Sequence, residues 1–341
     1  MITQIKITNF GPLPDIDWKL GQINLVIGGN GAGKTMLLKA MYAAIKTVEE
    51  YQRGDSPKSV EEILAEKLIW TFQADKLGDL VRHGEKQLQF HLDLPKNQRK
   101  AQSLSFGLSS VAQTKLSECQ PLHLKPREDN SIFLPAKEVL SLHKVILKSR
   151  DTDKAFGFDD TYYDLAKVLQ SHPTMGKNYK GFAQSREKLE AITGGVVRHD
   201  DKTGRWYFQQ GKNKYAIGAT AEGIKKIAIL DNLLGNRYLS KDSIVFIDEA
   251  ESALHPRAIS QLMEIIAALA AEGLQFVIST HSYFVIKKLL LIALEKKISI
   301  PTLSFWDGGV LPADLKDGMP DNPIIDESIK LYEQEVELAF K

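Results

Sequence analysis

The stretch "INLVIGGNGAGKTMLLKAMYAAI", residues 23–45, decides the fold class of this chain. Its apolar run, residues 23–27, is typical of a buried strand. Four glycines within six residues follow, at positions 28–33, and then Lys34 and Thr35. From residue 37 to residue 45 apolar side chains recur at spacings of one, three and four, the pattern of an amphipathic helix. The stretch therefore predicts a strand, a glycine loop and a helix.

The glycine loop matches the pattern G-x-x-x-x-G-K-[ST] without a gap. Glycines let the backbone curl so that its N–H groups face phosphate oxygens, and the N-terminus of the following helix favours the same negative charge. Lys34 is expected to contact the β- and γ-phosphates, and the Thr35 hydroxyl to ligate Mg²⁺. The sequence thus predicts a site for ATP and Mg²⁺. Its nucleotide-binding residues are Gly28, Gly29, Asn30, Gly31, Ala32, Gly33, Lys34, Thr35 and Met36.

A second candidate site is "SIVFIDEAESALHP", residues 243–256, in which four apolar residues end in Asp248 and Glu249. A carboxylate at the tip of a buried strand can hold the Mg²⁺ shell, the role we expect for Asp248. Glu249, one residue on, can orient or deprotonate the attacking water. Two acids after a strand are often a solvated helix start, but the phosphate loop in the same chain favours the catalytic interpretation.

The third candidate site is "FVISTHS", residues 276–282, a strand that ends near His281. A lone histidine is commonly structural. At the end of a further core strand, after the acidic pair, it can reach a γ-phosphate or polarise water. The expected catalytic residues are therefore Glu249, His281 and Lys34.

Bulk composition excludes few functions. The 341 residues carry 44 basic and 43 acidic side chains, so no global attraction to nucleic acid or anionic lipid follows, although a local basic groove stays open. One cysteine, Cys119, fits a reducing compartment. The N-terminus lacks the layout of a signal peptide, and lysines interrupt the most apolar segment, residues 284–297. We expect a cytoplasmic protein with no membrane partner.

The order of "GGNGAGKT", "IVFIDEAESALHP" and "STHS" resembles an ABC-type ATPase head of the SMC/RecF/OLD (overcoming-lysogenisation-defect) kind. The opening "KITNFGPLPDIDWKLGQINLVIGGNGAGKT" is similar to the start of those proteins, and "FIDEAESALHP" is most similar to OLD-like ATPases. The resemblance covers residues 1–45 and 215–290. It implies a P-loop at residues 28–35, a Mg²⁺-associated Asp248, a catalytic base at Glu249 and a switch histidine at His281.

The resemblance also implies a homodimer with composite ATP sites. The family's signature segment begins a helix and contacts the γ-phosphate bound by the opposite subunit; here the candidate is "ATAEGIKKIAIL", residues 219–230, with Thr220 and Gly223 as ligands. The usual serine is Ala221 or is replaced by Thr220, and Thr220 as a plain helix N-cap is an equally good interpretation. The lysine pair 225–226 lies near this interface. The Q-loop glutamine has no clear counterpart, Gln73 competing with residues 137–138.

The expected fold class is α/β: a P-loop NTPase core with a mainly parallel sheet, an antiparallel β portion and a helical insert. Residues 1–135 form the N-terminal part of the ATPase head with the P-loop and a β subdomain. Residues 136–192 form a helical insert, with helices expected at 137–150 and 179–192. Residues 193–341 form the C-terminal part, with the signature-like helix, the Walker B strand and the switch histidine.

The expected function is a Mg²⁺-dependent ATPase whose ATP-driven dimerisation controls a partner effector or DNA processing, in phage defence or DNA repair. About 60 residues follow His281, too few for the nuclease domain of many OLD proteins, so a separately encoded effector is expected. The alternative is an ATP-binding subunit of a membrane transporter, which the degenerate signature disfavours. A scaffold that binds ATP without hydrolysis is disfavoured by Glu249 and His281.

Overall fold

A six-stranded sheet forms the centre of the protein. The computed structural model describes residues 1–341 except 56, 98–99, 171–179, 201, 307–308 and 341. The strand order is β14 (Gly309–Asp314), β13 (Pro301–Trp306), β3 (Ile23–Ile27), β12 (Gln275–Thr280), β11 (Ile244–Ile247) and β7 (Ser131–Leu134). Every neighbouring pair is parallel except β13 with β14. The mainly parallel sheet predicted from the sequence is therefore confirmed.

The parallel strands are buried on both faces, which explains why they are continuous apolar runs in the sequence. Successive side chains of a strand point to opposite faces. Ile23, Leu25 and Ile27 pack into one hydrophobic core, whereas Val26 packs into the other. The same division separates Ile247 from Phe246. The sheet thus divides two apolar layers, and both must be covered by other elements.

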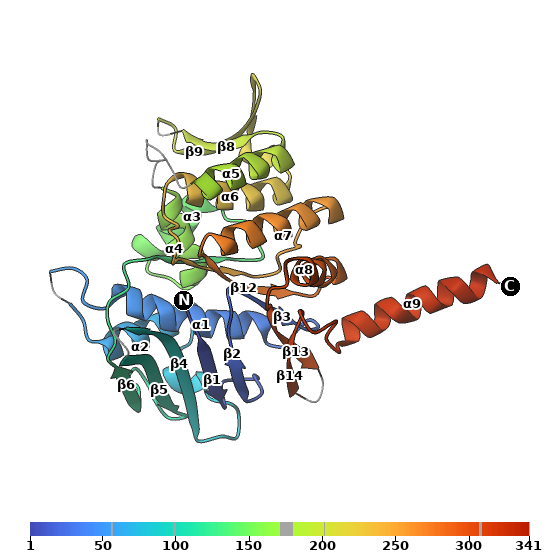
Figure 1. Cartoon of the computed structure of the whole chain (residues 1–341). Helices are drawn as coiled ribbons and strands as arrows, with labels where there is room; N and C mark the ends of the chain where they lie inside the picture. Colours follow the sequence, from blue (N-terminus) through green and yellow to red (C-terminus); the bar gives the residue numbers. More distant parts are fainter. Residues whose placement is uncertain (56, 98–99, 171–179, 201, 307–308, 341) are drawn as a thin grey trace.

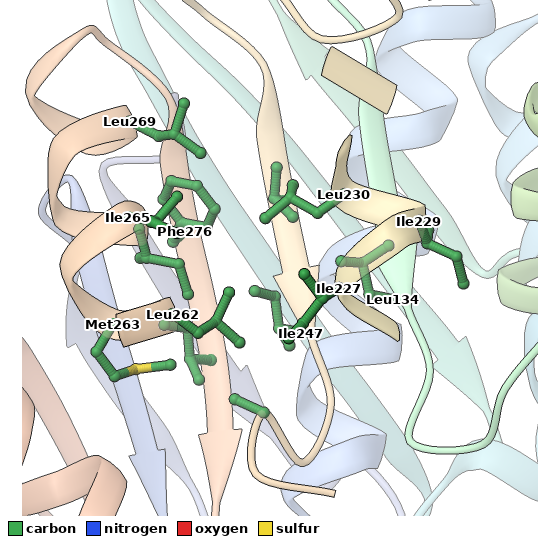
Figure 2. Close-up of a cluster of buried hydrophobic side chains, with 14 of the residues drawn as sticks. Leu134, Ile227, Ile229, Leu230, Ile247, Leu262, Met263, Ile265, Leu269 and Phe276 are labelled. Atoms are coloured by element: carbon green, nitrogen blue, oxygen red, sulfur yellow. The ribbon is translucent and has the colours of Figure 1, made fainter. Parts of the chain in front are cut away.

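Helices cover one face of the sheet. They are α6 (Glu222–Gly235), α7 (Pro256–Ala271) and α8 (Tyr283–Lys296), and α5 (Lys180–Thr193) packs on α6 and α7. Figure 2 shows side chains of α6, including Ile227 and Leu230, on the sheet beside Ile247, while Leu262 and Ile265 of α7 lie beside Phe276. Proline occupies the first turn of α7, and Gly273, at φ +117°, follows its end, an arrangement that is common at helix ends.

The opposite face is covered by α1 (Lys34–Glu50) and α2 (Val60–Phe72) together with a second, antiparallel sheet. In α1, Tyr42 packs edge-on against Phe133 and Phe246 of the central sheet, with ring centroids 5.7 and 5.8 Å apart. The antiparallel sheet has the order β2 (Ile16–Lys19), β1 (Gln4–Thr8), β4 (Gln87–Asn97), β5 (Lys100–Ser109) and β6 (Glu118–Leu122). This sheet is the predicted antiparallel β portion.

Most of the remaining elements come between β7 and α6 in the sequence. They are α3 (His143–Asp151), α4 (Asp160–Leu169), a hairpin sheet of β8 (Val196–Asp200), β9 (Arg205–Gln210) and β10 (Asn213–Ala216), and the short 3₁₀ turns η1 (Leu77–Leu80) and η2 (Ile217–Ala219). The last helix, α9 (Pro323–Ala339), projects away from the body (Figure 1). In the part of the chain that the structure describes, no helix is long and apolar enough to cross a membrane.

One predicted helix begins later than its pattern indicates. The sequence predicts a helix over residues 137–150, but α3 begins at His143. The Glu138 carboxylate accepts the Ser141 N–H at 3.0 Å, and the Leu142 N–H donates to the Val139 carbonyl, so residues 138–142 form turns instead. The helix predicted over 179–192 is confirmed from Lys180 on, and residue 179 lies outside the described residues.

Candidate nucleotide site

The loop between β3 and α1 has the backbone conformation that its glycines allow. Gly31 and Gly33 have φ of +77° and +97°, in the left-handed region. A Cβ atom on Gly33 would lie 2.6 Å from Leu13 Cδ2, so this position also lacks room for a side chain. No described side chain caps the N-terminus of α1. Its first N–H groups are therefore available to an anion at the loop, which fits the triphosphate predicted there.

Lys34 lies inside this loop, only 6% exposed, with Nζ 2.8 Å from the carbonyl oxygens of both Gly28 and Gly29. Burial lowers the pKa of Lys34, while the carboxylates of Asp248 and Glu249 act in the opposite direction. The Lys34 ammonium group therefore lies where the sequence predicts phosphate oxygens.

Thr35 and Asp248, 213 residues apart, meet side by side. The Thr35 hydroxyl donates to the Asp248 carboxylate, at 2.9 Å from Oδ2 and 3.1 Å from Oδ1. Parallel pairing of β3 and β11 with the intervening β12 brings their carboxyl ends to one edge of the sheet. A hydroxyl and a carboxylate are oxygen donors of the kind Mg²⁺ prefers, so the two residues predicted as metal ligands fit that ion.

Glu249 has a backbone conformation that is rare for a residue with a side chain, with φ of +48°. Its N–H donates to Ser279 Oγ at 3.0 Å, and the Ser279 hydroxyl in turn donates to Asp248 Oδ1 at 2.5 Å. On the other side, Lys226 Nζ donates to the Asp248 carbonyl at 3.1 Å and to the Glu249 carbonyl. These contacts from β12 and α6 fix the strained backbone and so the direction of the Glu249 side chain.

His281 lies beside two carboxylates. Its Nδ1 is 3.7 Å from Glu249 Oε1 and 3.4 Å from Glu251 Oε1. Glu251 also accepts the His281 N–H at 2.9 Å and the Thr280 hydroxyl at 2.8 Å. The side chain of Glu251 is 9% exposed, against 35% for Glu249 and 42% for His281. Glu251 therefore holds the loop of His281 against the loop after β11 (the acidic loop, residues 248–254), while the side chains of Glu249 and His281 face solvent.

Sequence reasoning missed two residues of this site. Glu251 is the second glutamate of "DEAES". No sequence motif marks a glutamate whose role is to hold two loops together. Lys226 is noticed only as half of a lysine pair, yet it is buried, and burial lowers its pKa to about 8. Its neighbour Lys225 is equally buried but turns to Glu222, Ser141 and Glu138, at 2.9, 3.1 and 3.4 Å. Which of the two lysines reaches the acidic loop depends on the rotation of α6, which spacing alone does not define.

The signature-like segment packs against the same acidic loop. A Cβ atom on Gly223 would lie 2.6 Å from the Ala253 carbonyl oxygen, so the first turn of α6 contacts the backbone that follows Glu251. The N-cap of α6 is Ala221, without a side-chain hydrogen bond. Thr220 instead donates to the Ala216 carbonyl at 3.3 Å. The interpretation of Thr220 as the helix N-cap is therefore wrong, because Thr220 is the C-cap of η2 and α6 begins only at Glu222, with Ala221 between them as its N-cap.

Two cavities adjoin these loops. One, of about 700 Å³, is lined by residues 29–32 of the glycine loop and by Leu13, Arg82, Phe305 and Trp306. Its size and mixed polarity suit the sugar and base of a nucleotide. The other, of about 320 Å³, lies between the end of β7 and α6, and Lys137, Glu138 and Lys226 line it. Gln73 is elsewhere: its side-chain amide faces the backbone N–H groups of residues 157–159.

A phosphate loop after β3, an acid after β11 and a histidine after β12 define the chain as a P-loop ATPase domain with an α/β fold. The chain belongs to the family described as "AAA domain, putative AbiEii toxin, Type IV TA system", whose profile matches residues 23–287.

Solved structures with a similar fold include an Smc head bound to the C-winged helix domain of ScpA. It has 13% identity and a TM-score of 0.57, covering 93% of this chain and 98% of that one. A second is an Smc head domain with an extended coiled coil, bound to the C-terminal domain of ScpA derived from Pyrococcus furiosus, at 12% identity, TM-score 0.53 and 98% coverage of both chains. At this identity the likeness concerns the fold alone. A search of curated proteins finds no match.

Proposed function

We propose that this chain is a Mg²⁺-dependent ATPase that hydrolyses ATP to ADP and phosphate. The observation that carries the proposal is the contact between the Thr35 hydroxyl and the Asp248 carboxylate, with Lys34 on one side and Glu249 on the other. Thr35 and Asp248 would hold Mg²⁺, which supplies positive charge to the β- and γ-phosphates when bound.

The protein's own groups divide the remaining work. Lys34 and the first N–H groups of α1 bind the phosphates through charge and hydrogen bonds. Glu249, half-exposed at the strand end, orients the attacking water and accepts its proton. His281, whose backbone N–H is held by Glu251, would donate to the γ-phosphate. Positioning and electrostatic stabilisation of this kind are the main sources of rate in phosphoryl transfer.

Phosphate release tests this proposal directly. Glu249→Gln keeps the shape of the side chain but removes the base, so turnover should fall by about 10²- to 10⁴-fold while ATP still binds. Glu251→Gln is the comparison, because Glu251 holds the loop rather than the water, and a smaller loss is expected. Unchanged turnover in Glu249→Gln would show that another group activates the water.

We propose further that two copies enclose two ATP molecules, with Thr220 and Gly223 of one copy at the phosphates bound by the other. The resemblance to ABC-type heads and the uncapped first turn of α6 support this arrangement. The decisive measurement is the solution mass of Glu249→Gln with Mg²⁺-ATP and with Mg²⁺-ADP. A dimer that forms with ATP alone supports it, and an unchanged mass contradicts it.

For the biological process, we propose ATP-controlled action on a separately encoded effector in cellular defence. The family description, which names a toxin and a type IV toxin–antitoxin system, supports defence over a role confined to DNA repair. DNA stays a second candidate partner. Co-expression with the product of an adjacent gene, with purification in ATP and in ADP, tests whether an effector binds in one nucleotide state.

A further inference from the structure

The helix α9 leaves most of its side chains uncovered. Figure 1 shows it extending from the body beyond β13 and β14. Among its described residues only Ile325 is buried, whereas Ile329, Leu331, Tyr332 and Leu338 are 51–71% exposed. Isolated exposed apolar residues are ordinary, but several on one helix mark an interaction surface.

One apolar stripe runs along α9, while Leu331 and Leu338 lie off it, toward the opposite side. Ile325, Ile329, Tyr332 and Val336 recur at spacings of four, three and four, which places them on one face of a helix. The surface outside this stripe is mainly acidic: residues 323–339 contain five carboxylates and one lysine. α9 is therefore an amphipathic, negatively charged helix, and within the chain its first turn is the part that packs against α8 and the core.

The outer face of α8 has the complementary character. Phe284, Leu291 and Leu294 are 53%, 50% and 51% exposed and lie seven and three residues apart, along one stripe of the helix. Lys287 and Glu295 are exposed on the same stripe, and Lys296 and Lys297 are exposed at its end, so that lysines outnumber the carboxylate three to one. An apolar stripe with lysines is what an acidic amphipathic helix would cover, with apolar contacts in the centre and opposite charges at the rim.

One chain carries both surfaces but does not join them. α9 is a single continuous helix of 17 residues, about 25 Å long at 1.5 Å per residue, and it departs from α8 after its first turn. A second copy can supply the missing contact, and a two-fold axis then repeats it with the roles exchanged. Two reciprocal helix contacts also approach the area of about 1,600 Å² typical of a specific interface more closely than one does.

We propose that α9 is a dimerisation arm that docks on the outer face of α8 of a second copy of this chain. The contact does not depend on the proposed ATPase function, because none of the residues named for the arm or its receiving face belongs to the phosphate loop or to the acidic loop. The arm would hold two copies together in every nucleotide state, so the ATP-dependent dimer proposed above is tested in a chain that carries both Glu249→Gln and Tyr332→Glu, in which the arm contact is broken.

Solution mass without nucleotide tests the proposal on the full-length chain. A concentration-dependent dimer is expected for the native chain and for Lys34→Ala, which separates this contact from any effect of ATP. Tyr332→Glu places a charge in the apolar face and should weaken the dimer by at least about tenfold. Gln334→Glu adds the same charge on the side of α9 opposite Tyr332 and should leave the dimer intact. A monomeric native chain, or equal effects of the two variants, would overturn the proposal.

Cysteine cross-linking identifies what α9 touches. In a Cys119→Ser background, Leu291→Cys chains mixed with Tyr332→Cys chains should form a disulfide between two chains under mild oxidation. Tyr332→Cys mixed with Lys19→Cys, in β2, is the control for random contact and should give none. A chain with both Leu291→Cys and Tyr332→Cys that cross-links only within itself would show that α9 folds back on its own α8, and would overturn the proposal.

Discussion

Two buried lysines at the candidate site make nearly the same contacts for different purposes. Lys34 donates to the carbonyls of Gly28 and Gly29, and Lys226 donates to those of Asp248 and Glu249. Of the two partners of Lys34, Gly29 lies in open space, since an added Cβ there would meet nothing within 4 Å, whereas a Cβ on Gly28 would lie 2.8 Å from Phe305 Cβ. The partners of Lys226 lie in a loop that α6 and β12 hold on both sides.

The difference shows how one chemical group serves binding or positioning. A ligand can replace the carbonyls around Lys34, because the loop is open and the ammonium can turn to phosphate. The carbonyls at Lys226 belong to a loop that packs against α6, whose first turn touches the Ala253 carbonyl through Gly223. We therefore expect Lys34 to govern ATP affinity and Lys226 to govern the rate of hydrolysis.

The largest effect is expected for Lys34→Ala. It removes a charge-assisted contact to two phosphates, so ATP affinity should fall by about 100-fold or more. Stability should change little, because burial already lowers the pKa of Lys34 and disfavours its charge. Titration with a fluorescent nucleotide, with thermal unfolding of the nucleotide-free protein as the control, measures both quantities. Retained affinity would contradict the assignment.

Lys226→Met should separate rate from affinity. With one support of Glu249 gone, turnover should fall by about 10- to 100-fold, the range expected when a catalytic group is misplaced, whereas the dissociation constant of ATP stays within about threefold. Lys225→Met is the matched control, since that lysine is equally buried but contacts Glu222 and Glu138.

A second comparison tests whether Lys226 acts through Glu249. In the Glu249→Gln background, Lys226→Met should cause no further loss of turnover, because residues that act as a unit are non-additive. Independent losses that multiply would mean that Lys226 affects hydrolysis by another route.

The role of Lys34 can be predicted from the sequence, whereas the role of Lys226 cannot. Lys34 and Thr35 stand in one contiguous motif, and the strand and helix around them fix their geometry, so the loop, the parallel sheet and the meeting of Thr35 with Asp248 could all be predicted. Lys226 and Glu251 act by hydrogen bonds to loops 22 and 30 residues away, which depend on how α6 and the loop after β12 pack. The late start of α3 has the same origin, a Glu138 side chain that completes a turn.

Substitutions of Gly223 and Gly29 should differ in their effect on stability. Gly223→Ala would place a methyl group 2.6 Å from the Ala253 carbonyl oxygen, so the free energy of unfolding should fall by about 1–3 kcal/mol. Gly29→Ala has open space at its Cβ, so the free energy of unfolding should change by no more than about 0.5 kcal/mol. Urea unfolding of both variants provides the measurement, and equal losses would show that α6 does not pack tightly on the acidic loop.

The last expected effect is a pH dependence of stability that belongs to Lys226. Burial lowers its pKa from 10.5 to about 8, so between these values the unfolded chain binds a proton that the folded chain has released. Stability contributed by this group therefore rises with pH from about 8 to 10.5, by at most about 1.4 kcal/mol per unit, and is constant below about 8, where both states are protonated. Lys226→Met lacks the group. The difference in free energy of unfolding between the native chain and this variant should therefore shift in favour of the native chain as the pH rises from about 8 to 10.5. Lys225→Met gives the baseline for removing a lysine. Parallel curves for the native chain and Lys226→Met would mean that Lys226 keeps its charge in the fold, held by the three carboxylates around it, Glu251, Asp248 and Glu249, more strongly than burial opposes it.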